Sequence, residues 1–134
     1  MSSGPQTSPA RTVLAFDGDC GFCESSVRLI REHARPRIAA VPWQALPEEL
    51  TGPHLARLDR EVVLFHRGAA RYGGADAVSR FLGSSPARRY RAAGFVLRLP
   101  FVRPLAHLVY RWVAANRHRL PGGTAACAVP RPPD

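Results

Sequence analysis

Residues 13–23 read VLAFDGDCGFC, and this stretch decides the fold. An almost wholly apolar strand over Thr12–Phe16 is expected at the centre of a sheet. A turn follows it and leads into a helix that we predict from about Gly21 to Ala34. Cys20 and Cys23 then fall at the first turn of that helix, where their sulfurs are close enough to join and separate. A Cys-x-x-Cys pair in this position is the usual layout of a dithiol/disulfide redox site.

Length and composition fit one globular domain. The chain has 134 residues, of which 46% are hydrophobic and 22% charged, enough for a core without metal or disulfide staples. Its three cysteines are too few for a secreted disulfide scaffold, and Met1–Ala10 lacks the pattern of a signal peptide. We therefore expect a cytoplasmic protein. In that compartment a Cys-x-x-Cys is more often catalytic or metal-binding than structural.

The rest of the pattern predicts a thioredoxin-like order of elements. After the first helix we expect a strand, a short helix or two turns, a two-stranded hairpin, a helix, and two further helices. These span Ile38–Val41, Pro47–Leu58, Glu61–Phe65, Ala69–Tyr72, Asp76–Leu82, and about 87–98 and 101–118. The expected fold is α/β, with a central mixed sheet of about four strands flanked by helices and a C-terminal helical extension. We predict a disordered leader over 1–10, a single domain over 11–120 with its C-terminal helices from about residue 87, and a flexible tail over 121–134.

The charge of the chain is uneven. Its net charge is +9, and every basic residue other than histidine is arginine. From Pro86 to Leu120 there are eight arginines and no acidic residue. A solvated basic face on amphipathic helices is the favoured interpretation, and contact with an anionic surface, either nucleic acid or acidic lipid, is the other. Arginines and prolines interrupt the apolar stretch Ala92–Ala115 too often for a transmembrane helix, whereas a helix lying on a membrane stays open.

The position of the dithiol assigns a role to each cysteine. Cys20, nearer the helix end and expected to be the more exposed, would be the attacking thiolate, and Cys23 would resolve the mixed disulfide. The helix N-terminus favours a thiolate, while the nearby carboxylates of Asp17 and Asp19 oppose it. The expected substrate is a protein or small-molecule disulfide, with a reducing partner that the sequence does not identify. No cofactor or metal is predicted, and none of the histidines is assigned a role.

Several residues around the dithiol have two interpretations. Asp17 could move the proton that Cys23 loses, or it could accept backbone N–H bonds at the turn. We expect Asp19 to cap the helix. Cys127 could be a third redox thiol, although a free cysteine without a role is also compatible with the sequence. Asp76 is expected to cap its own helix, and the alternative is that the N–H groups around it bind a carboxylate such as that of glutathione.

The segment Phe16–Cys23 resembles the opening motif of the DCC family, thioredoxin-like thiol-disulfide oxidoreductases named for an Asp-Cys-Cys signature. Asp17, Cys20 and Cys23 match that signature. The resemblance extends over about residues 12–130, through Gly74–Ala77, a late tyrosine and Asn-Arg pattern in Tyr110–Arg119, and a Cys-x-x-Pro ending at Pro130. It implies a redox protein.

One feature of the wider thioredoxin superfamily is missing from this sequence. Its members usually carry a cis-proline before the third strand, where it faces the dithiol and aligns the backbone of the substrate. The corresponding stretch here, Arg57–Glu61, contains no proline.

Three other functions remain as alternatives. A zinc site would need Cys127 and a distant histidine such as His118 to complete four ligands. Asp17-Gly18-Asp19 after an apolar strand also resembles the nucleophile motif of haloacid-dehalogenase-type phosphatases, but this chain has no lysine and no aspartate pair late in the sequence, and it is short for that fold. In the third alternative the Cys-x-x-Cys is not catalytic, and the basic helices dock on nucleic acid or membrane.

Overall fold

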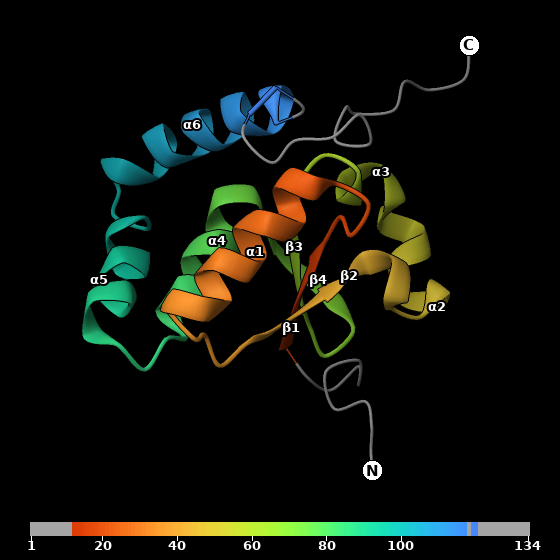
Figure 1. Ribbon diagram of the computed structural model, residues 1–134, viewed down its shortest axis with the longest axis horizontal. Helices are drawn as coiled ribbons and strands as arrows, with labels where there is room; N and C mark the ends of the chain where they lie inside the picture. The colour runs from red at the N-terminus through yellow and green to blue at the C-terminus, as the bar shows by residue number, and fades with distance from the viewer. Residues whose placement is uncertain (1–11, 118, 121–134) are drawn as a thin grey trace.

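A central four-stranded sheet organises the computed structural model, which describes residues 12–117, 119 and 120 (Figure 1). The strand order is β2-β1-β3-β4, with β1 and β2 parallel and the other neighbouring pairs antiparallel. The strands are β1 (Thr12–Phe16), β2 (Ala39–Pro42), β3 (Val63–His66) and β4 (Ala69–Gly73). The mixed α/β sheet that the sequence predicted is confirmed, including the inner position of its first strand.

Helices pack on both faces of this sheet. The main ones are α1 (Gly21–His33), α4 (Gly74–Gly83), α5 (Arg88–Val96) and α6 (Val102–Asn116). Between β2 and β3 lie four short helical segments, η2 (Trp43–Ala45), α2 (Glu48–Thr51), η3 (Gly52–His54) and α3 (Leu55–Leu58). The helix expected at 21–34 and the C-terminal helical extension are therefore present. Division into leader, domain and tail stays a prediction, because residues 1–11 and 121–134 lie outside the described residues.

Alternation along the strands divides the core into two clusters. Val13, Ala15, Val63 and Phe65 face the segment 43–58, which contributes Leu46 and Leu58. On the opposite face Leu14 and Leu64 pack with Ala77 and Phe81 of α4, and Ile30 of α1 lies against the same cluster. Because successive side chains of a strand point to opposite faces, both faces of the inner strands are covered, which explains why their sequences are continuously apolar.

The β3–β4 hairpin closes through a two-residue turn. Its central residues Arg67 and Gly68 both have positive φ angles, 53° and 81°. Such a turn matches the right-handed twist of the flanking strands, but only glycine, asparagine and aspartate adopt it readily. Arg67 therefore occupies a backbone conformation that its side chain disfavours.

Side-chain contacts fix α6 against the rest of the domain. Arg103 donates two hydrogen bonds to the carboxylate of Asp76 on α4, at 3.0 and 2.7 Å. The Tyr110 hydroxyl accepts the backbone N–H of Val62 at 2.9 Å. The expectation that Asp76 caps α4 is wrong: Gly73 is the N-cap residue and no side chain caps that end. The carboxylate of Asp76 instead joins α4 to α6 because two arginine donors outcompete local backbone N–H groups.

Candidate active site

The two cysteines lie at the junction between strand β1 and helix α1. Cys20 is the N-cap residue of α1, with an extended backbone, and its Sγ accepts the backbone N–H of Cys23 at 3.5 Å. The cap position arises because the turn after β1 ends at Cys20, whose N–H bonds the Asp17 carbonyl at 3.3 Å. The N-terminal end of a helix favours negative charge on the sulfur that caps it.

The exposure of the two cysteines is the reverse of the sequence expectation. Cys20 is fully buried, with 0% of its surface exposed, and Cys23 is half-buried. Cys20 is disulfide-bonded and Cys23 is a free thiol, so the two are not joined to each other. Cys127, predicted as a third redox thiol, lies outside the described residues.

A buried arginine from the end of α6 reaches Cys23. Arg117 Nη1 donates to Cys23 Sγ at 3.1 Å, and its Nη2 donates to the Asp59 carbonyl at 2.6 Å. The same Nη2 lies 4.0 Å from Asp17 Oδ2. Only 3% of Arg117 is exposed, so its charge acts on its neighbours with little screening by water. Sequence reasoning placed Arg117 in the late Asn-Arg pattern but did not assign it to the site.

Two opposing effects act on the thiol of Cys23. Burial raises the pKa of Cys23, because a thiolate loses hydration there. The charge and hydrogen bond of Arg117 lower that pKa, and the carboxylate of Asp17 raises it further. The net effect is a raised pKa of the Cys23 thiol. Arg117 is therefore the group that limits the cost of ionising Cys23.

Asp17 has the structural one of the two roles considered from the sequence, because it accepts a backbone N–H bond at the turn. Its Oδ1 accepts the Asp19 N–H at 3.0 Å and the side-chain Nε2 of Gln44 at 2.9 Å. Gln44 follows β2, and because β1 and β2 are parallel, the residues after both strands meet at one edge of the sheet. Gln44 was not identified from sequence, since its distance from Asp17 along the chain hides the contact. The proton-transfer role of Asp17 stays a prediction.

The expectation that Asp19 caps α1 is wrong. Cys20 holds the cap position, and the exposed Asp19 carboxylate accepts a hydrogen bond from Gln44 Nε2 at 3.3 Å. The turn places Asp19 one residue too early for its side chain to reach the N–H groups of the helix, because a capping side chain bonds the second or third N–H after it.

The segment before β3 contributes its backbone to the site. All described peptide bonds are trans, which agrees with the absence of a proline from Arg57–Glu61. Arg57 and Glu61 form an ion pair at 2.6 Å. Between them the Asp59 carbonyl receives Arg117. This segment therefore holds the arginine that contacts the dithiol.

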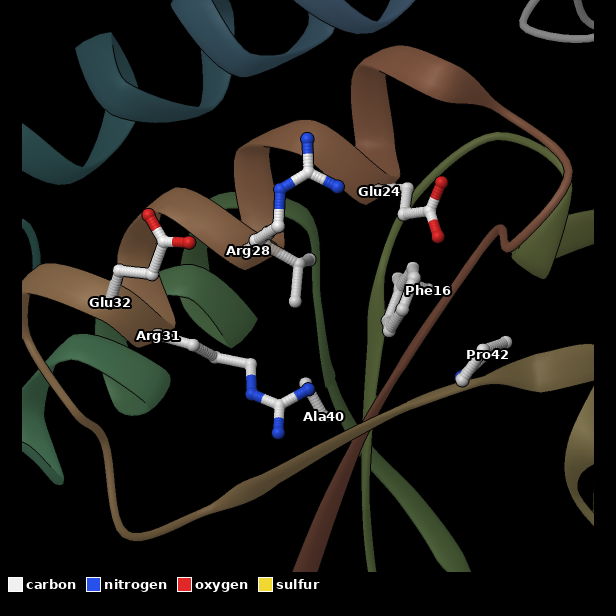
Figure 2. Close-up of a pocket in the computed structure, with 8 residues that line it drawn as sticks. Phe16, Glu24, Arg28, Arg31, Glu32, Ala40 and Pro42 are labelled. Carbon is white, nitrogen blue, oxygen red and sulfur yellow. The ribbon is translucent and has the colours of Figure 1, made fainter.

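A groove of about 510 Å³ runs beside the dithiol helix, between α1 and β2 (Figure 2). Phe16, Glu24 and Pro42 lie at one end of it, and Arg31 extends toward Ala40 farther along (Figure 2). Phe16 directly precedes Asp17, and Glu24 directly follows Cys23. Neither cysteine, Asp17 nor Arg117 is among the residues that line the groove, which combines apolar walls with charges of both signs.

Metal ligands do not gather in the part of the chain that the structure describes. There, no group of three or more histidine, cysteine, aspartate or glutamate side chains could hold a metal ion. Cys127 and His118, which the zinc alternative would need, are outside the described residues. Among the helices of residues 12–117, none is long and apolar enough to cross a membrane.

Comparison with known proteins identifies the family of the chain. A family model described as DCC1-like thiol-disulfide oxidoreductase matches residues 14–123, which include the dithiol, Asp17 and Arg117. No curated protein and no solved structure matches the chain. The family match covers most of the sequence and agrees with the motif resemblance and the thioredoxin-like fold. The chain belongs to the DCC1-like thiol-disulfide oxidoreductase family.

Proposed function

We propose that this chain is an enzyme that exchanges thiols and disulfides through Cys20 and Cys23. The observation that carries the proposal is the arrangement at the first turn of α1. Cys20 bears a disulfide, its Sγ accepts the Cys23 N–H at 3.5 Å, and Cys23 is a free thiol held by Arg117. A free thiol close to a disulfide sulfur is the state from which an exchange step proceeds.

In the reducing direction the attacking residue is Cys20 although it is buried, because its Sγ caps the N-terminus of α1, which favours a thiolate. Its thiolate forms a bond to one sulfur of a protein or small-molecule disulfide, and the other sulfur leaves as a thiolate. Cys23 then loses its proton and attacks Cys20 Sγ, which forms the Cys20–Cys23 disulfide and releases the second substrate thiolate. The substrate gains two electrons and the dithiol loses two. A thiol reductant of the cell, such as would be present in the cytoplasm, restores the dithiol by the reverse exchanges.

Two neighbours support the second step. Arg117 donates to the Cys23 sulfur and so stabilises its thiolate before attack. Asp17 is the proposed acceptor of the Cys23 proton, because its carboxylate lies close enough to raise the pKa of the Cys23 thiol. We place the part of a substrate that flanks its disulfide in the groove of Figure 2, because Phe16 and Glu24, which line it, adjoin Asp17 and Cys23 in the sequence.

Cys127 belongs to the same proposal as a third redox thiol. Cys127 is the third cysteine of the chain, and it lies in the Cys-x-x-Pro that the resemblance to the DCC family includes. Attack of the Cys23 thiolate on a Cys20–Cys127 disulfide would form the Cys20–Cys23 bond and release Cys127 as a thiolate. Peptide mapping after rapid thiol trapping, on the wild type and on Cys127→Ser, identifies the pairs.

The proposal is tested by thiol trapping in glutathione buffers, with metal analysis of the same sample. We expect a reversible two-electron couple on metal-free protein that Cys20→Ser abolishes. Cys23→Ser/Cys127→Ser should accumulate a mixed disulfide with glutathione on Cys20, because no resolving thiol remains. A mixed disulfide on Cys23 of the Cys20→Ser/Cys127→Ser variant, and none on Cys20 of the Cys23→Ser/Cys127→Ser variant, would reverse the two roles. Stoichiometric zinc with thiols that resist oxidation would contradict the proposal.

A further inference from the structure

Large hydrophobic side chains gather on the outside of the C-terminal helices. Of the nine that are exposed among the described residues, seven lie between residues 95 and 112. Phe101 is 92% exposed and Trp112 is 61% exposed. The seven are Phe95, Val96, Phe101, Leu105, Leu108, Val109 and Trp112. A patch of this kind on a folded domain marks an interaction site more often than it occurs by chance.

Five of the seven form one stripe on α6, running from Phe101 to Trp112. Their positions, 101, 105, 108, 109 and 112, have the spacing that places side chains on a single face of a helix. The opposite face of α6 is already used, because Arg103 bonds Asp76 and Tyr110 bonds Val62. An apolar groove of about 410 Å³ between α4 and α6 borders the stripe at Leu105. The stripe is thus a second face of the helix and not the one that builds the core.

The surroundings of the stripe are basic. Residues 86–120 contain eight arginines and no acidic residue. On α5, Arg88, Arg89 and Arg91 are exposed, and Arg111 is exposed on α6. One arginine of α6, Arg103, is neutralised by Asp76. Exposed aromatic and aliphatic side chains beside arginines are the composition of a helix that lies in the interface of an anionic membrane.

We propose that the exposed face of α5 and α6 docks on a bilayer containing anionic phospholipid. The apolar stripe would enter the boundary between head groups and acyl chains, and the arginines would bind the lipid phosphates. This surface is on the side of α6 opposite to Arg103 and Tyr110, and docking would require neither cysteine, so the proposal stands independently of the redox chemistry.

Charge and composition favour lipid over two other occupants. A second copy of the chain packed on this face by two-fold symmetry would bring arginine-rich surfaces together without any acidic partner from residues 86–120. A nucleic acid would satisfy the arginines, but its interfaces are polar and would leave the stripe from Phe101 to Trp112 in water. An anionic bilayer can both bind the arginines through its lipid phosphates and bury the apolar stripe.

Co-sedimentation of the full-length chain with vesicles tests the proposal. With vesicles of phosphatidylglycerol and phosphatidylcholine we expect binding that is at least tenfold stronger than with phosphatidylcholine alone, and weaker at high salt. The double variant Phe101→Ser/Trp112→Ser should lose at least tenfold in binding. Leu29→Ser on α1 is the matched control, since Leu29 is 57% exposed outside the surface and should bind like the wild type. Arg111→Gln should weaken binding about fivefold, and Arg31→Gln on α1 should not.

Tryptophan fluorescence gives a second readout. The emission should shift to shorter wavelength with anionic vesicles, and Trp112→Phe should abolish the shift, because the other tryptophan, Trp43, packs against the core. Equal binding to both kinds of vesicle, absence of binding, or binding that the double variant retains would overturn the proposal. So would a dimer in sedimentation that Phe101→Ser dissociates, or duplex DNA that binds more tightly than anionic vesicles. Cys20→Ser should bind vesicles like the wild type, which separates this result from failure of the redox proposal.

Discussion

Replacing Arg117 with methionine should raise the pKa of the Cys23 thiol further, because it removes the cation and the hydrogen bond that lower this pKa. Arg117 Nη1 donates to Cys23 Sγ at 3.1 Å from a nearly fully buried position. A hydrogen bond to a charged group is worth about 1.5–3 kcal/mol, and one pKa unit is about 1.4 kcal/mol. The attraction between full charges about 4 Å apart at an effective dielectric of about 20 is about 4 kcal/mol, which sets an upper limit. Asp17, 4.0 Å from Arg117, offsets part of it.

The same substitution should slow the second exchange step. At a pH below the pKa of Cys23, loss of a hydrogen bond worth about 1.5–3 kcal/mol to the thiolate lowers the thiolate fraction about 10- to 100-fold. The nucleophilicity of the remaining thiolate rises with its pKa, with a Brønsted coefficient of about 0.4–0.5. The net rate of attack on Cys20 should therefore fall about 3- to 15-fold. Stopped-flow measurement of glutathione release from the Cys20–glutathione mixed disulfide reports this rate.

The pKa itself is measured on a background that leaves one thiol. In Cys20→Ser/Cys127→Ser, the alkylation rate of Cys23 by iodoacetamide as a function of pH gives its pKa with and without Arg117→Met. Arg117→Lys should recover part of the effect, because it keeps a positive charge. Arg111→Met is the matched control, an exposed arginine of the same helix. A folded Arg117→Met protein whose Cys23 pKa stays within about 0.3 units of the background would refute the reasoning.

Three further predictions concern the scaffold. Asp76→Asn should lower the free energy of unfolding at about pH 7, because Arg103 holds the pKa of Asp76 below its ordinary value. This contribution to stability is present above about pH 4 and is lost as the pH falls through the folded-state pKa. Urea titrations of the wild type and the variant should therefore differ near pH 7 and agree near pH 2. Gly94→Ala should destabilise by about 1–3 kcal/mol in the same assay, because its Cβ would lie 2.5 Å from the Ser79 carbonyl oxygen between α5 and α4, whereas an unchanged midpoint would contradict that packing. Arg67→Asn should stabilise by about 0.5–1 kcal/mol and raise the thermal midpoint by about 2–5 °C in calorimetry, since asparagine tolerates the positive φ of the hairpin turn.

The dithiol could be located from sequence because everything that positions it is local. An apolar strand, a turn and the start of a helix follow one another within residues 12–23, and the structure reproduces them. Arg117 could not be assigned to the site in the same way, since 94 residues separate it from Cys23. Spacing along the chain gives no information on a contact between elements that meet only after the sheet and α6 have packed.

The contacts of the Asp19 and Asp76 carboxylates could not be predicted from the sequence either. Sequence reasoning gave Asp19 and Asp76 local partners, because an aspartate near a helix start commonly caps that helix. In the structure both carboxylates bond side chains distant in sequence, Gln44 for Asp19 and Arg103 for Asp76. The two guanidinium donors of Arg103 offer Asp76 a stronger bond than the adjacent backbone N–H groups, whereas Asp19 lies one residue too early in the turn to cap α1. Only Asp17, whose Oδ1 bonds the N–H two residues later, keeps the local contact that the turn predicted.

The register of α6 connects the redox site to the proposed membrane surface. Arg103, Tyr110 and Arg117 recur every seven residues, so they lie on one side of the helix and bond Asp76, Val62 and Cys23 in turn. Rotating α6 about its axis by one residue would break all three contacts at once. The same register fixes the stripe from Phe101 to Trp112 on the outer side. A helix held in this way can bring a guanidinium to the dithiol and present an apolar face to a bilayer without either requirement disturbing the other.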